Sequence, residues 1–382
     1  MSETGARHLV LVGAGHAHVE VLRAFGRNRP CNMRMTLITR EAASPYSGML
    51  PGAIAGHYRR DETEIQVAPL ARFAGAELIV DEVTFLDAQA QLVHRKAGPP
   101  VAYDFLSLDI GSTPNIGDVL GAAAHAIPVK PIDGFFARFD RLHADVLAGR
   151  IRRLALVGGG AGGVELLLAV AHRLRRDRPG QPLELTLISG SERILDCFSA
   201  GFRRRIEAAL AEQAIAVVAG ARAVGVSPDG LTLSNDRFVA ADAVLWTTQA
   251  SPASFLADAG LECDEHGFLL VDEMLRAKEH PEIFAAGDMI AFAPRALPKA
   301  GVYAVRAGPV LAHNLRASLA GTGLSPFRPQ RRALVILATG PRHAVATGYG
   351  FTLEGDWVWR WKDRIDRRFM ARFRVDRSEV QR

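Results

Sequence analysis

The sequence predicts an α/β protein built from two similar units with parallel sheets, followed by a small α+β region at the C-terminus. The first observation is an internal repeat, because residues 8–26 and 153–171 each read as an apolar strand, a glycine-rich turn and an amphipathic helix. The second is that the repeat continues, with β-rich runs at residues 34–39 and 184–189. The third is that each copy closes on an apolar strand ending in Ser/Thr-Pro. Matching segments in the same order favour duplicated units over chance.

Bulk composition fits this organisation. The chain has 382 residues, enough for two or three domains at roughly 150 residues each. Hydrophobic residues make up 48% and charged residues 23%, which is typical of a globular protein. The formal net charge of +5 permits an anionic partner but selects none.

The cysteines carry no recognisable chemistry. Cys31, Cys197 and Cys263 lie far apart, and no CxxC pair occurs. We therefore expect no disulfide framework, no dithiol centre, no metal site and a reducing compartment. The N-terminus lacks a signal-peptide pattern, and no run of about 18 apolar residues occurs. The expectation is a cytoplasmic protein, soluble or peripheral on the inner face of the membrane.

The first glycine turn has the pattern Gly13-x-Gly15 between a strand and a helix. Glycine at these positions allows a tight turn and close backbone approach to a pyrophosphate, which the helix N-terminus then binds. The usual third glycine is replaced by His18. We interpret His16 and His18 as shaping this site rather than performing acid-base chemistry.

The second turn, Gly158-x-Gly160-x-x-Gly163, is complete and correctly placed for a dinucleotide. Two nucleotide sites in one chain suggest a bound flavin beside a diffusible nicotinamide, because hydride passes between them. The acid that normally ends the second strand and binds the ribose is missing in both copies, which read Thr39-Arg40-Glu41 and Ser189-Gly190-Ser191. NADH and NADPH both stay open, with a slight preference for NADH because no basic cluster replaces the acid.

A resemblance to a known group rests on the motif IFAAGD, which ends at Asp288, and on the segments GAGHAHVEVLR, SPYSGMLPGAIAGHY, KAGVYAVRAGPVLAHNLRA and WKDRIDRRFM. Over residues 8–320 the chain resembles flavoproteins with two dinucleotide-binding domains. These are the pyridine nucleotide-disulfide oxidoreductases, type II NADH dehydrogenases and sulfide:quinone reductases. Within that group it is most similar to the flavoprotein often fused ahead of selenide, water dikinase.

The resemblance implies two Rossmann-like domains of the glutathione-reductase-like FAD/NAD(P) fold. Residues 1–115 and 270–322 would form a discontinuous FAD-binding domain, 116–269 an inserted NAD(P)H-binding domain, and 323–382 the C-terminal region. FAD would be bound, with NADH or NADPH as co-substrate. A helix over residues 299–317 would point its N-terminus at the flavin, and Pro309 would shorten or kink it.

The resemblance also implies the cofactor-binding residues. Asp288 would bind the ribityl chain, and the segment before Pro51 would lie along the isoalloxazine ring. Lys130 occupies the place of a lysine near the domain junction, although a solvated loop lysine is the alternative. The expected FAD residues are Gly13, Gly15, His16, His18, Arg40, Pro51, Val83, Gly111, Lys130, Gly287, Asp288, Lys299, Gly301 and Val302. The expected NAD(P)H residues are Gly158, Gly160, Gly163, Glu165 and Ser189.

The electron acceptor is not identified by the sequence. Residues 40–60 contain no cysteine pair, so a dithiol disulfide reductase is not expected. Arg306 stands where type II NADH dehydrogenases have a glutamine near the quinone, so a quinone is not indicated either. No catalytic residue is assigned. The alternative is a non-catalytic redox sensor or partner module, linked through the fused relatives to selenium or sulfur metabolism.

The C-terminal segment 357–374 is aromatic and basic, and we expect a helix with Trp361, Ile365, Phe369 and Phe373 in one stripe. One interpretation is peripheral contact with an anionic membrane. The other is a stripe packed on the protein body or across a homodimer, which the interspersed aspartates favour. Nucleic acid is not an expected partner, because the basic residues form no extended signature elsewhere.

Overall fold

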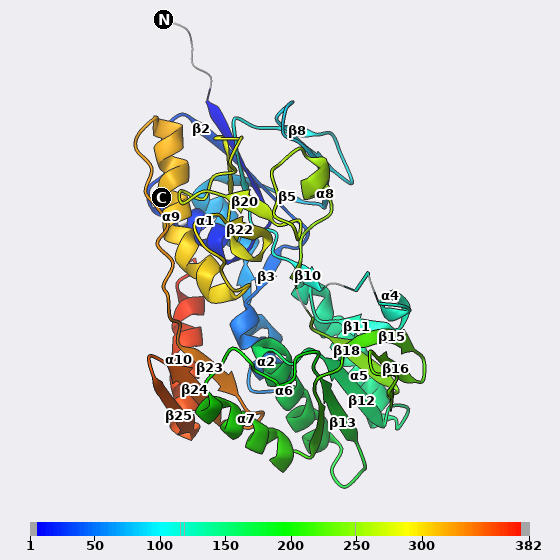
Figure 1. The fold of residues 1–382 in the computed structure, drawn as a ribbon. Coiled ribbons are helices and arrows are strands. Elements are labelled where there is room, and N and C mark those ends of the chain that lie inside the picture. The colour runs from blue at the N-terminus through cyan, green and yellow to red at the C-terminus, as the bar shows by residue number, and fades with distance from the viewer. Residues whose placement is uncertain (1–5, 115, 118, 249, 376–382) are drawn as a thin grey trace, which may run out of the picture.

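A computed structural model describes residues 6–375 except 115, 118 and 249. Two α/β units lie one above the other, with a smaller C-terminal region beside both (Figure 1). The first five residues of the proposed FAD-binding part and the last seven of the C-terminal region lie outside the described residues.

The first unit is built on a five-stranded parallel sheet in the order β21-β9-β1-β2-β5. Its strands are β1 (Arg7–Val12), β2 (Met33–Thr39), β5 (Ala76–Val80), β9 (Phe105–Leu108) and β21 (Ile283–Ala285). Most residues of β1, β2, β9 and β21 are apolar and buried, as expected for a parallel sheet that helices cover, whereas the edge strand β5 is partly exposed. The edge strand β21 comes from far along the chain, so residues beyond the second unit complete the first sheet.

Three longer helices belong to this unit. They are α1 (His16–Arg27), α3 (Val67–Ala74) and α9 (Gly301–Ala320). Helix α1 follows the first glycine turn and buries its apolar face between α3 and α9. The expected helix over 299–317 therefore begins and ends later than predicted. It also runs through Pro309, so the predicted shortening is wrong; this residue lies on the exposed face of the helix.

The second unit repeats the first. Its parallel sheet has the order β11-β18-β12-β13-β14. The strands are β11 (Ala126–Pro128), β12 (Arg153–Val157), β13 (Glu184–Ile188), β14 (Ile215–Val218) and β18 (Ala243–Trp246). The helices are α4 (Ala122–His125), α5 (Phe135–Leu147), α6 (Ala161–Asp177) and α7 (Ala200–Glu212). In each unit the strand before the glycine turn pairs in parallel with the strand after the helix that follows it, β1 with β2 and β12 with β13. This confirms the predicted α/β repeat.

Shorter elements connect these layers. Two antiparallel pairs are β3 (Ala43–Pro45) with β4 (Glu64–Gln66), and β10 (Thr113–Pro114) with β19 (Ala250–Ser251). One three-stranded antiparallel sheet consists of β6 (Val83–Asp87), β7 (Leu92–Arg95) and β8 (Val101–Ala102). Another consists of β15 (Ala223–Ser227), β16 (Gly230–Leu233) and β17 (Phe238–Ala240). A further parallel pair is β20 (Leu269–Val271) with β22 (Ile290–Phe292). The remaining helical segments are α2 (Leu50–Ile54), α8 (Phe255–Asp258) and the 3₁₀ turns η1 (Ser47–Met49), η2 (Arg60–Thr63), η3 (Ile132–Gly134) and η4 (Gly287–Met289).

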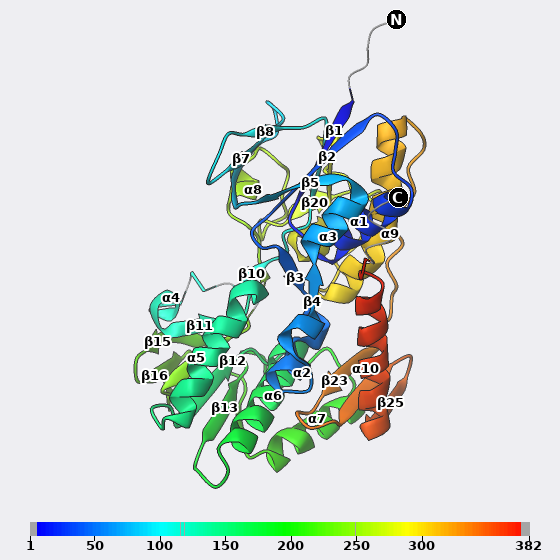
Figure 2. The ribbon, with the colours of Figure 1, turned by 180° about the vertical axis from the view of Figure 1, so that it is seen from behind.

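The C-terminal region is a three-stranded antiparallel sheet followed by a helix, as the α+β prediction requires. Its elements are β23 (Val335–Ala338), β24 (Ala344–Gly348), β25 (Phe351–Gly355) and α10 (Asp356–Ala371). Figure 2 shows α10 standing against these strands and reaching from the lower unit towards the upper one. Leu337 and Val345 join the core of the second unit, whereas Phe369 and Phe373 join the core of the first.

The predicted single stripe on α10 is wrong. Phe369 and Phe373 are buried, but Ile365 is 41% exposed and Trp361 is half-buried. A four-residue spacing advances by about 400° on a helix with 3.6 residues per turn, so each step drifts by about 40°. Residues four apart therefore do not stay on one face of α10, and Phe373 lies beyond the end of the helix at Ala371.

Candidate active site

A cavity of about 870 Å³ opens at the carboxyl edge of the first sheet. Residues that directly follow β1, β2, β9 and β21 line it, and the strand order changes direction between β9 and β1. Open α/β sheets bind ligands at this kind of switch point, outside the strand carboxyl ends. The volume is within the range of about 300–1,000 Å³ that is usual for small-molecule sites.

The floor of the cavity is the first glycine turn. Gly13 has a φ of +87°, which an L side chain rarely adopts, and a Cβ at Gly15 would overlap the Asp109 carboxylate. Asp109 follows β9, and its Oδ2 accepts hydrogen bonds from the backbone N–H groups of Ala17 (2.8 Å) and His18 (3.1 Å). A carboxylate from another strand therefore caps helix α1, which has no side-chain cap of its own.

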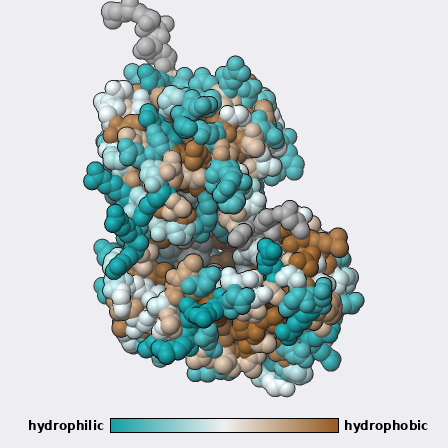
Figure 3. All heavy atoms as spheres, viewed as in Figure 1, coloured by the Kyte–Doolittle hydropathy of each residue, from teal (hydrophilic) through white to brown (hydrophobic). Residues whose placement is uncertain are grey.

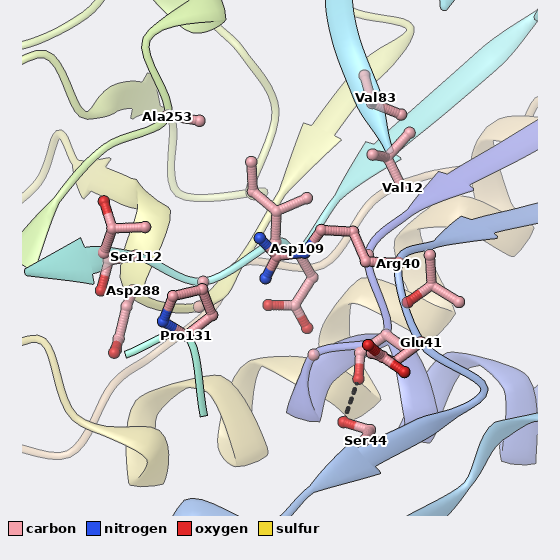
Figure 4. A pocket seen from close by; sticks show the side chains of 18 of the residues that line it. Val12, Arg40, Glu41, Ser44, Val83, Asp109, Ser112, Pro131, Ala253 and Asp288 are labelled. Carbon is pink, nitrogen blue, oxygen red and sulfur yellow. Dashed lines mark hydrogen bonds between the residues drawn. The ribbon is translucent and has the colours of Figure 1, made fainter. Parts of the chain in front are cut away.

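Asp109 is fully enclosed. Its pKa is raised to about 7, chiefly by burial; the two N–H donors oppose this shift and the Asp288 carboxylate adds to it. Figure 4 shows Asp109 in the middle of the site, with Arg40 and Glu41 on one side and Ser112 and Asp288 on the other. The turn thus already holds an acidic group at the helix end where the fold places a phosphate.

His18 explains why the third glycine can be absent. Its Nδ1 donates to the carbonyl of Gly13 at 2.6 Å, and its Nε2 lies 2.8 Å from Oγ of Ser107 on β9. Burial lowers the pKa of His18 to about 4, so the ring is neutral and Nε2 accepts from the hydroxyl. The imidazole fills the space between helix and strand that a glycine would otherwise close.

The opposite wall joins segments from distant parts of the chain. The Lys130 ammonium donates to Oδ2 of Asp288 at 2.8 Å and to Oγ of Ser112 at 3.3 Å. Lys130 follows β11, which runs parallel to β18 and β12. The carboxyl ends of the second sheet therefore lie on the same side as this cavity, together with the second glycine turn.

Most of the FAD residues expected from sequence meet at this cavity. Those that line it are Gly13, Gly15, His16, Arg40, Val83, Gly111, Lys130, Gly287, Asp288 and Gly301. Others lie apart from its surface. His18 is buried beneath the turn, Pro51 is buried in α2, and Val302 is exposed on the first turn of α9. Lys299 donates to the carbonyl of Ile290 and lies over the ring of Phe268.

The second glycine turn is more open. A Cβ at Gly163 would overlap the carbonyl of Gly158, so glycine is required for close contact between helix α6 and its strand. A Cβ at Gly160 would meet nothing within 4 Å, which leaves room beside the helix N-terminus. Ser189 is buried at the end of β13, and its hydroxyl donates to the carbonyl of Ser191 at 3.4 Å.

Glu165 points away from this turn. Its Oε1 accepts from the backbone N–H of Ala338 on β23 at 2.9 Å. Burial raises the pKa of Glu165 to about 6, although the Lys362 ammonium opposes this shift. The proposed part of Glu165 in nucleotide binding therefore stays a prediction.

A buried charge cluster ties the C-terminal region to the cavity. Lys362 on α10 donates to the carbonyl of Gly48 at 2.6 Å and to Oδ2 of Asp366 at 2.8 Å. The ring of Phe369 stacks on Tyr46 with centroids 4.4 Å apart. Because Ser47 lines the cavity between these two contacts, α10 fixes one wall of the site.

The residues present fit a dinucleotide flavin. Gly13, Gly15 and Gly287 present bare backbone, and a Cβ at the last of these would overlap Asp109. His16 lines the cavity with its Nε2 buried and without a hydrogen-bond partner in the described part of the chain, so a bound molecule has a polar group to meet. Burial lowers the pKa of His16 to about 4, which leaves this nitrogen neutral.

Comparison with known proteins identifies the family of this chain. The model of the family described as "Pyridine nucleotide-disulphide oxidoreductase" matches residues 7–313. The chain belongs to this family. A relative from Bacillus subtilis, "NADH dehydrogenase-like protein YutJ", is 23% identical over 74% of this chain and 76% of its own length. "Demethylphylloquinone reductase NdbB" from Synechocystis is 25% identical over 72% of this chain and 69% of its own length.

Solved structures share the fold of this oxidoreductase. The sulfide:quinone oxidoreductase of Aquifex aeolicus has a TM-score of 0.80 at 18% identity, covering 97% of this chain and 92% of its own. NDH2 from Plasmodium falciparum in complex with NADH also reaches 0.80, at 14% identity, covering 96% and 97%. The chain is accordingly an FAD-dependent NAD(P)H oxidoreductase.

Within the described residues, three kinds of feature were sought in this oxidoreductase: reactive cysteines at the cavity, metal sites and membrane-spanning helices. The three cysteines are free, and none lines the cavity. In the described segments no group of three or more His, Cys, Asp or Glu side chains is placed to hold a metal ion. No described helix combines the length and apolar character needed to cross a membrane.

Sequence reasoning missed Asp109 and Ser112. The signal for Asp109 was available, because a charged residue stands at the end of the apolar run FLSLDIGS. A charge in such a run needs partners when it is buried. Ser112 carried no comparable signal, since its contact with Lys130 depends on how two distant loops meet.

Proposed function

We propose that this oxidoreductase takes hydride from NAD(P)H and passes the electrons to an acceptor that is not yet identified. Bound FAD would supply the chemistry, by accepting the hydride at its N5 atom and returning the electrons one step later. The observation that carries the proposal is that residues after β1, β2 and β9 of the first sheet and Lys130, after β11 of the second sheet, line one cavity. The relatives named as dehydrogenases and reductases favour this enzyme over a non-catalytic sensor.

The chain's own residues would hold the flavin in a defined orientation. Bare backbone at Gly13 and Gly15 would admit the pyrophosphate, and Asp288, held by Lys130, would accept hydrogen bonds from the ribityl chain. Helix α9 begins at Gly301 on the cavity wall, so its positive N-terminal end would stabilise negative charge on the ring. His16 would supply a neutral polar contact beside it.

The acceptor class is open to direct test. One relative is named as a demethylphylloquinone reductase and another as an "Alternative NAD(P)H-ubiquinone oxidoreductase". A quinone is therefore the first acceptor to assay. Arg306 is exposed on α9, and it would suit a small anionic acceptor instead. A screen with a soluble quinone and with anionic acceptors under anaerobic conditions separates the two.

Rapid mixing with NADH and NADPH tests the proposal. Anaerobic mixing should bleach the flavin absorbance with at least one nucleotide, whereas a sensor that does not turn over would stay yellow with both. Asp288→Ala should release FAD, because its carboxylate lines the cavity. Asp258→Ala, an exposed change at the end of α8, is the control and should purify with full flavin content. Fully yellow Asp288→Ala protein would show that the flavin lies elsewhere.

We also propose that this chain is most closely related to the flavoprotein fused to selenide, water dikinase. The four segments named for that resemblance support it, and WKDRIDRRFM contributes Lys362, Asp366 and Phe369 to the wall of the site. A link to selenium or sulfur metabolism would follow. Inclusion of selenite and polysulfide, both of which can be reduced, in the acceptor screen tests it, since no reaction with either would remove that link.

Two surfaces bear on the partners. The outer face of α10 carries Trp357, 48% exposed, and Ile365 among arginines, and we propose that segment 357–374 contacts anionic membranes peripherally. A homodimer is the alternative.

Apolar surface gathers at the far end of the second unit (Figure 3), where Leu120, Val224 and Phe238 are exposed. Co-sedimentation with anionic vesicles supports the first proposal, and a dimer in solution that ignores vesicles supports the second.

A further inference from the structure

The end of strand β13 lacks the acid that usually recognises a nicotinamide dinucleotide. Ser189 follows the strand, is 3% exposed, and directs its hydroxyl at the carbonyl of Ser191. Gly190 comes next and carries no side chain. An acid at this place accepts bonds from the ribose hydroxyls of NADH and repels the 2′-phosphate of NADPH. This site therefore offers no carboxylate at the strand end to exclude that phosphate.

An arginine from the neighbouring strand occupies the vacant place. Arg222 lies after β14, and a Cβ built on Gly190 would stand 2.6 Å from its Cγ. The stem of Arg222 therefore covers the residue that follows the missing acid. Its side chain is otherwise exposed, so the guanidinium is available to a ligand in solvent.

The backbone around Arg222 is held on two sides. The N–H of Gly220 donates to the carbonyl of Ser191 at 2.9 Å, which ties this loop to the one after β13. The Arg222 N–H donates to Oγ of Ser234 at 3.1 Å, and the Ser234 N–H donates to the carbonyl of Arg222 at 2.8 Å. A side chain on a fixed backbone loses less freedom when it binds a ligand.

We propose that Arg222 forms a 2′-phosphate subsite and that NADPH is the preferred reductant. A guanidinium presents planar, paired donors that match a phosphate, and an arginine near the strand end is the usual means of accepting the 2′-phosphate. The subsite rests on the proposed function, since it requires the second glycine turn to bind NAD(P)H. The sequence slightly favoured NADH because no basic cluster follows Ser189, and Arg222 lies more than thirty residues further along the chain.

Glu192 is the neighbouring acid that must be weighed. A Cβ at Gly220 would stand 3.1 Å from its Oε2, so this carboxylate lies against the loop after β14 rather than over Gly190. Arg222 is thus closer to the end of β13 than Glu192 is. Neutralising the acid with Glu192→Gln should strengthen binding of a 2′-phosphate, and an unchanged or weaker affinity would count against this arrangement.

Binding of four nucleotides to the flavin-loaded protein tests the subsite. Titration calorimetry with NADP⁺, NAD⁺, 2′,5′-ADP and 5′-AMP should show that the 2′-phosphate increases affinity by about tenfold or more. Arg222→Ala should lose about ten- to one-hundredfold in affinity for 2′,5′-ADP and less than about twofold for 5′-AMP. The affinity of Arg222→Lys for 2′,5′-ADP should lie between those of the wild-type protein and Arg222→Ala, since lysine keeps the positive charge but lacks the paired donors of a guanidinium. Arg237→Ala, an exposed arginine in the adjacent antiparallel hairpin, is the matched control.

The outcomes separate the two proposals. Equal losses for 2′,5′-ADP and 5′-AMP would mean that Arg222 contacts the adenosine instead, and would overturn the subsite. Unchanged affinities in Arg222→Ala would overturn it too, while binding at the second turn would still stand. If wild-type protein with full flavin content binds none of the four nucleotides, the proposed NAD(P)H site fails and the subsite fails with it. Flavin content and thermal unfolding of each variant show whether the protein has folded.

Discussion

The two glycine turns have the same place between strand and helix, but different side chains pack against them. Directly after β9 the first unit has Asp109, and directly after β18 the second has Thr247, whose hydroxyl donates to the carbonyl of Val157 at 3.0 Å. At the third glycine position, the first unit has buried His18 and the second has Gly163. The first turn is therefore closed by His18 and by Asp109 from β9, whereas α6 after the second turn has no side-chain cap.

This difference suits the two nucleotides. A turn held by an imidazole and a carboxylate is rigid before any ligand arrives, which favours a cofactor that stays bound. A turn made only of glycines and a threonine keeps helix N–H groups available for a molecule that must exchange. The comparison thus predicts that substitutions in the first turn act on retention of FAD, and that substitutions in the second act on NAD(P)H.

The largest effect should come from Gly15→Val. Its side chain would overlap the Asp109 carboxylate that caps α1. Overpacking costs about 1–3 kcal/mol, so FAD affinity should fall by about one-hundredfold and the protein should purify colourless. The control is Gly323→Val, at a position where a Cβ meets nothing within 4 Å. Absorbance at the flavin band measures both, and a fully yellow Gly15→Val protein would contradict the placement of the pyrophosphate.

Gly163→Ala should be more selective. Its Cβ would overlap the carbonyl of Gly158 and push helix α6 from the strand. We expect NAD(P)⁺ affinity to fall by about tenfold to one-hundredfold while FAD stays bound. Gly162→Ala is the matched control, since its Cβ meets nothing within 4 Å one residue away. Titration calorimetry and flavin absorbance measure the two effects, and loss of FAD from Gly163→Ala alone would end the proposed division of labour.

The smallest effect concerns pH. Burial raises the pKa of Asp109 to about 7, so its carboxylate is neutral below that pH and ionised above it. An ionised carboxylate and a pyrophosphate at the same helix end repel each other. FAD affinity should therefore weaken by at most about tenfold in total as pH rises from about 6 to about 8. Fluorescence titration of apoprotein with FAD measures the slope.

Asp109→Asn tests the cause of that slope. It removes the titrating group while keeping an acceptor for the helix N–H groups, so the pH dependence should flatten. His16 and His18, both with a pKa of about 4, stay neutral over this range and should not contribute. A slope that survives in Asp109→Asn would assign the effect to another group.

The sequence predicted the repeated α/β units and the residues at the cavity for a common reason. Glycine turns, apolar strands and the IFAAGD motif are local patterns, and parallel strands bring their carboxyl ends to one edge. What it could not predict depends on contacts between distant segments. Asp109 caps a helix that begins some ninety residues earlier, and Arg222 reaches the end of a strand from its neighbour. The predicted stripe on α10 was wrong because residues four apart drift around a helix and because the helix ends before Phe373.

The route of the chain has a consequence for how this protein is made. Strands β11 to β18, which complete the second sheet, lie within residues 126–246, but the first sheet needs β21 at residues 283–285. A growing polypeptide can therefore finish the later sheet while the earlier one still lacks its edge strand. We expect the inserted unit to resist protease on stalled nascent chains before the N-terminal unit does, because domains tend to fold as complete units during synthesis.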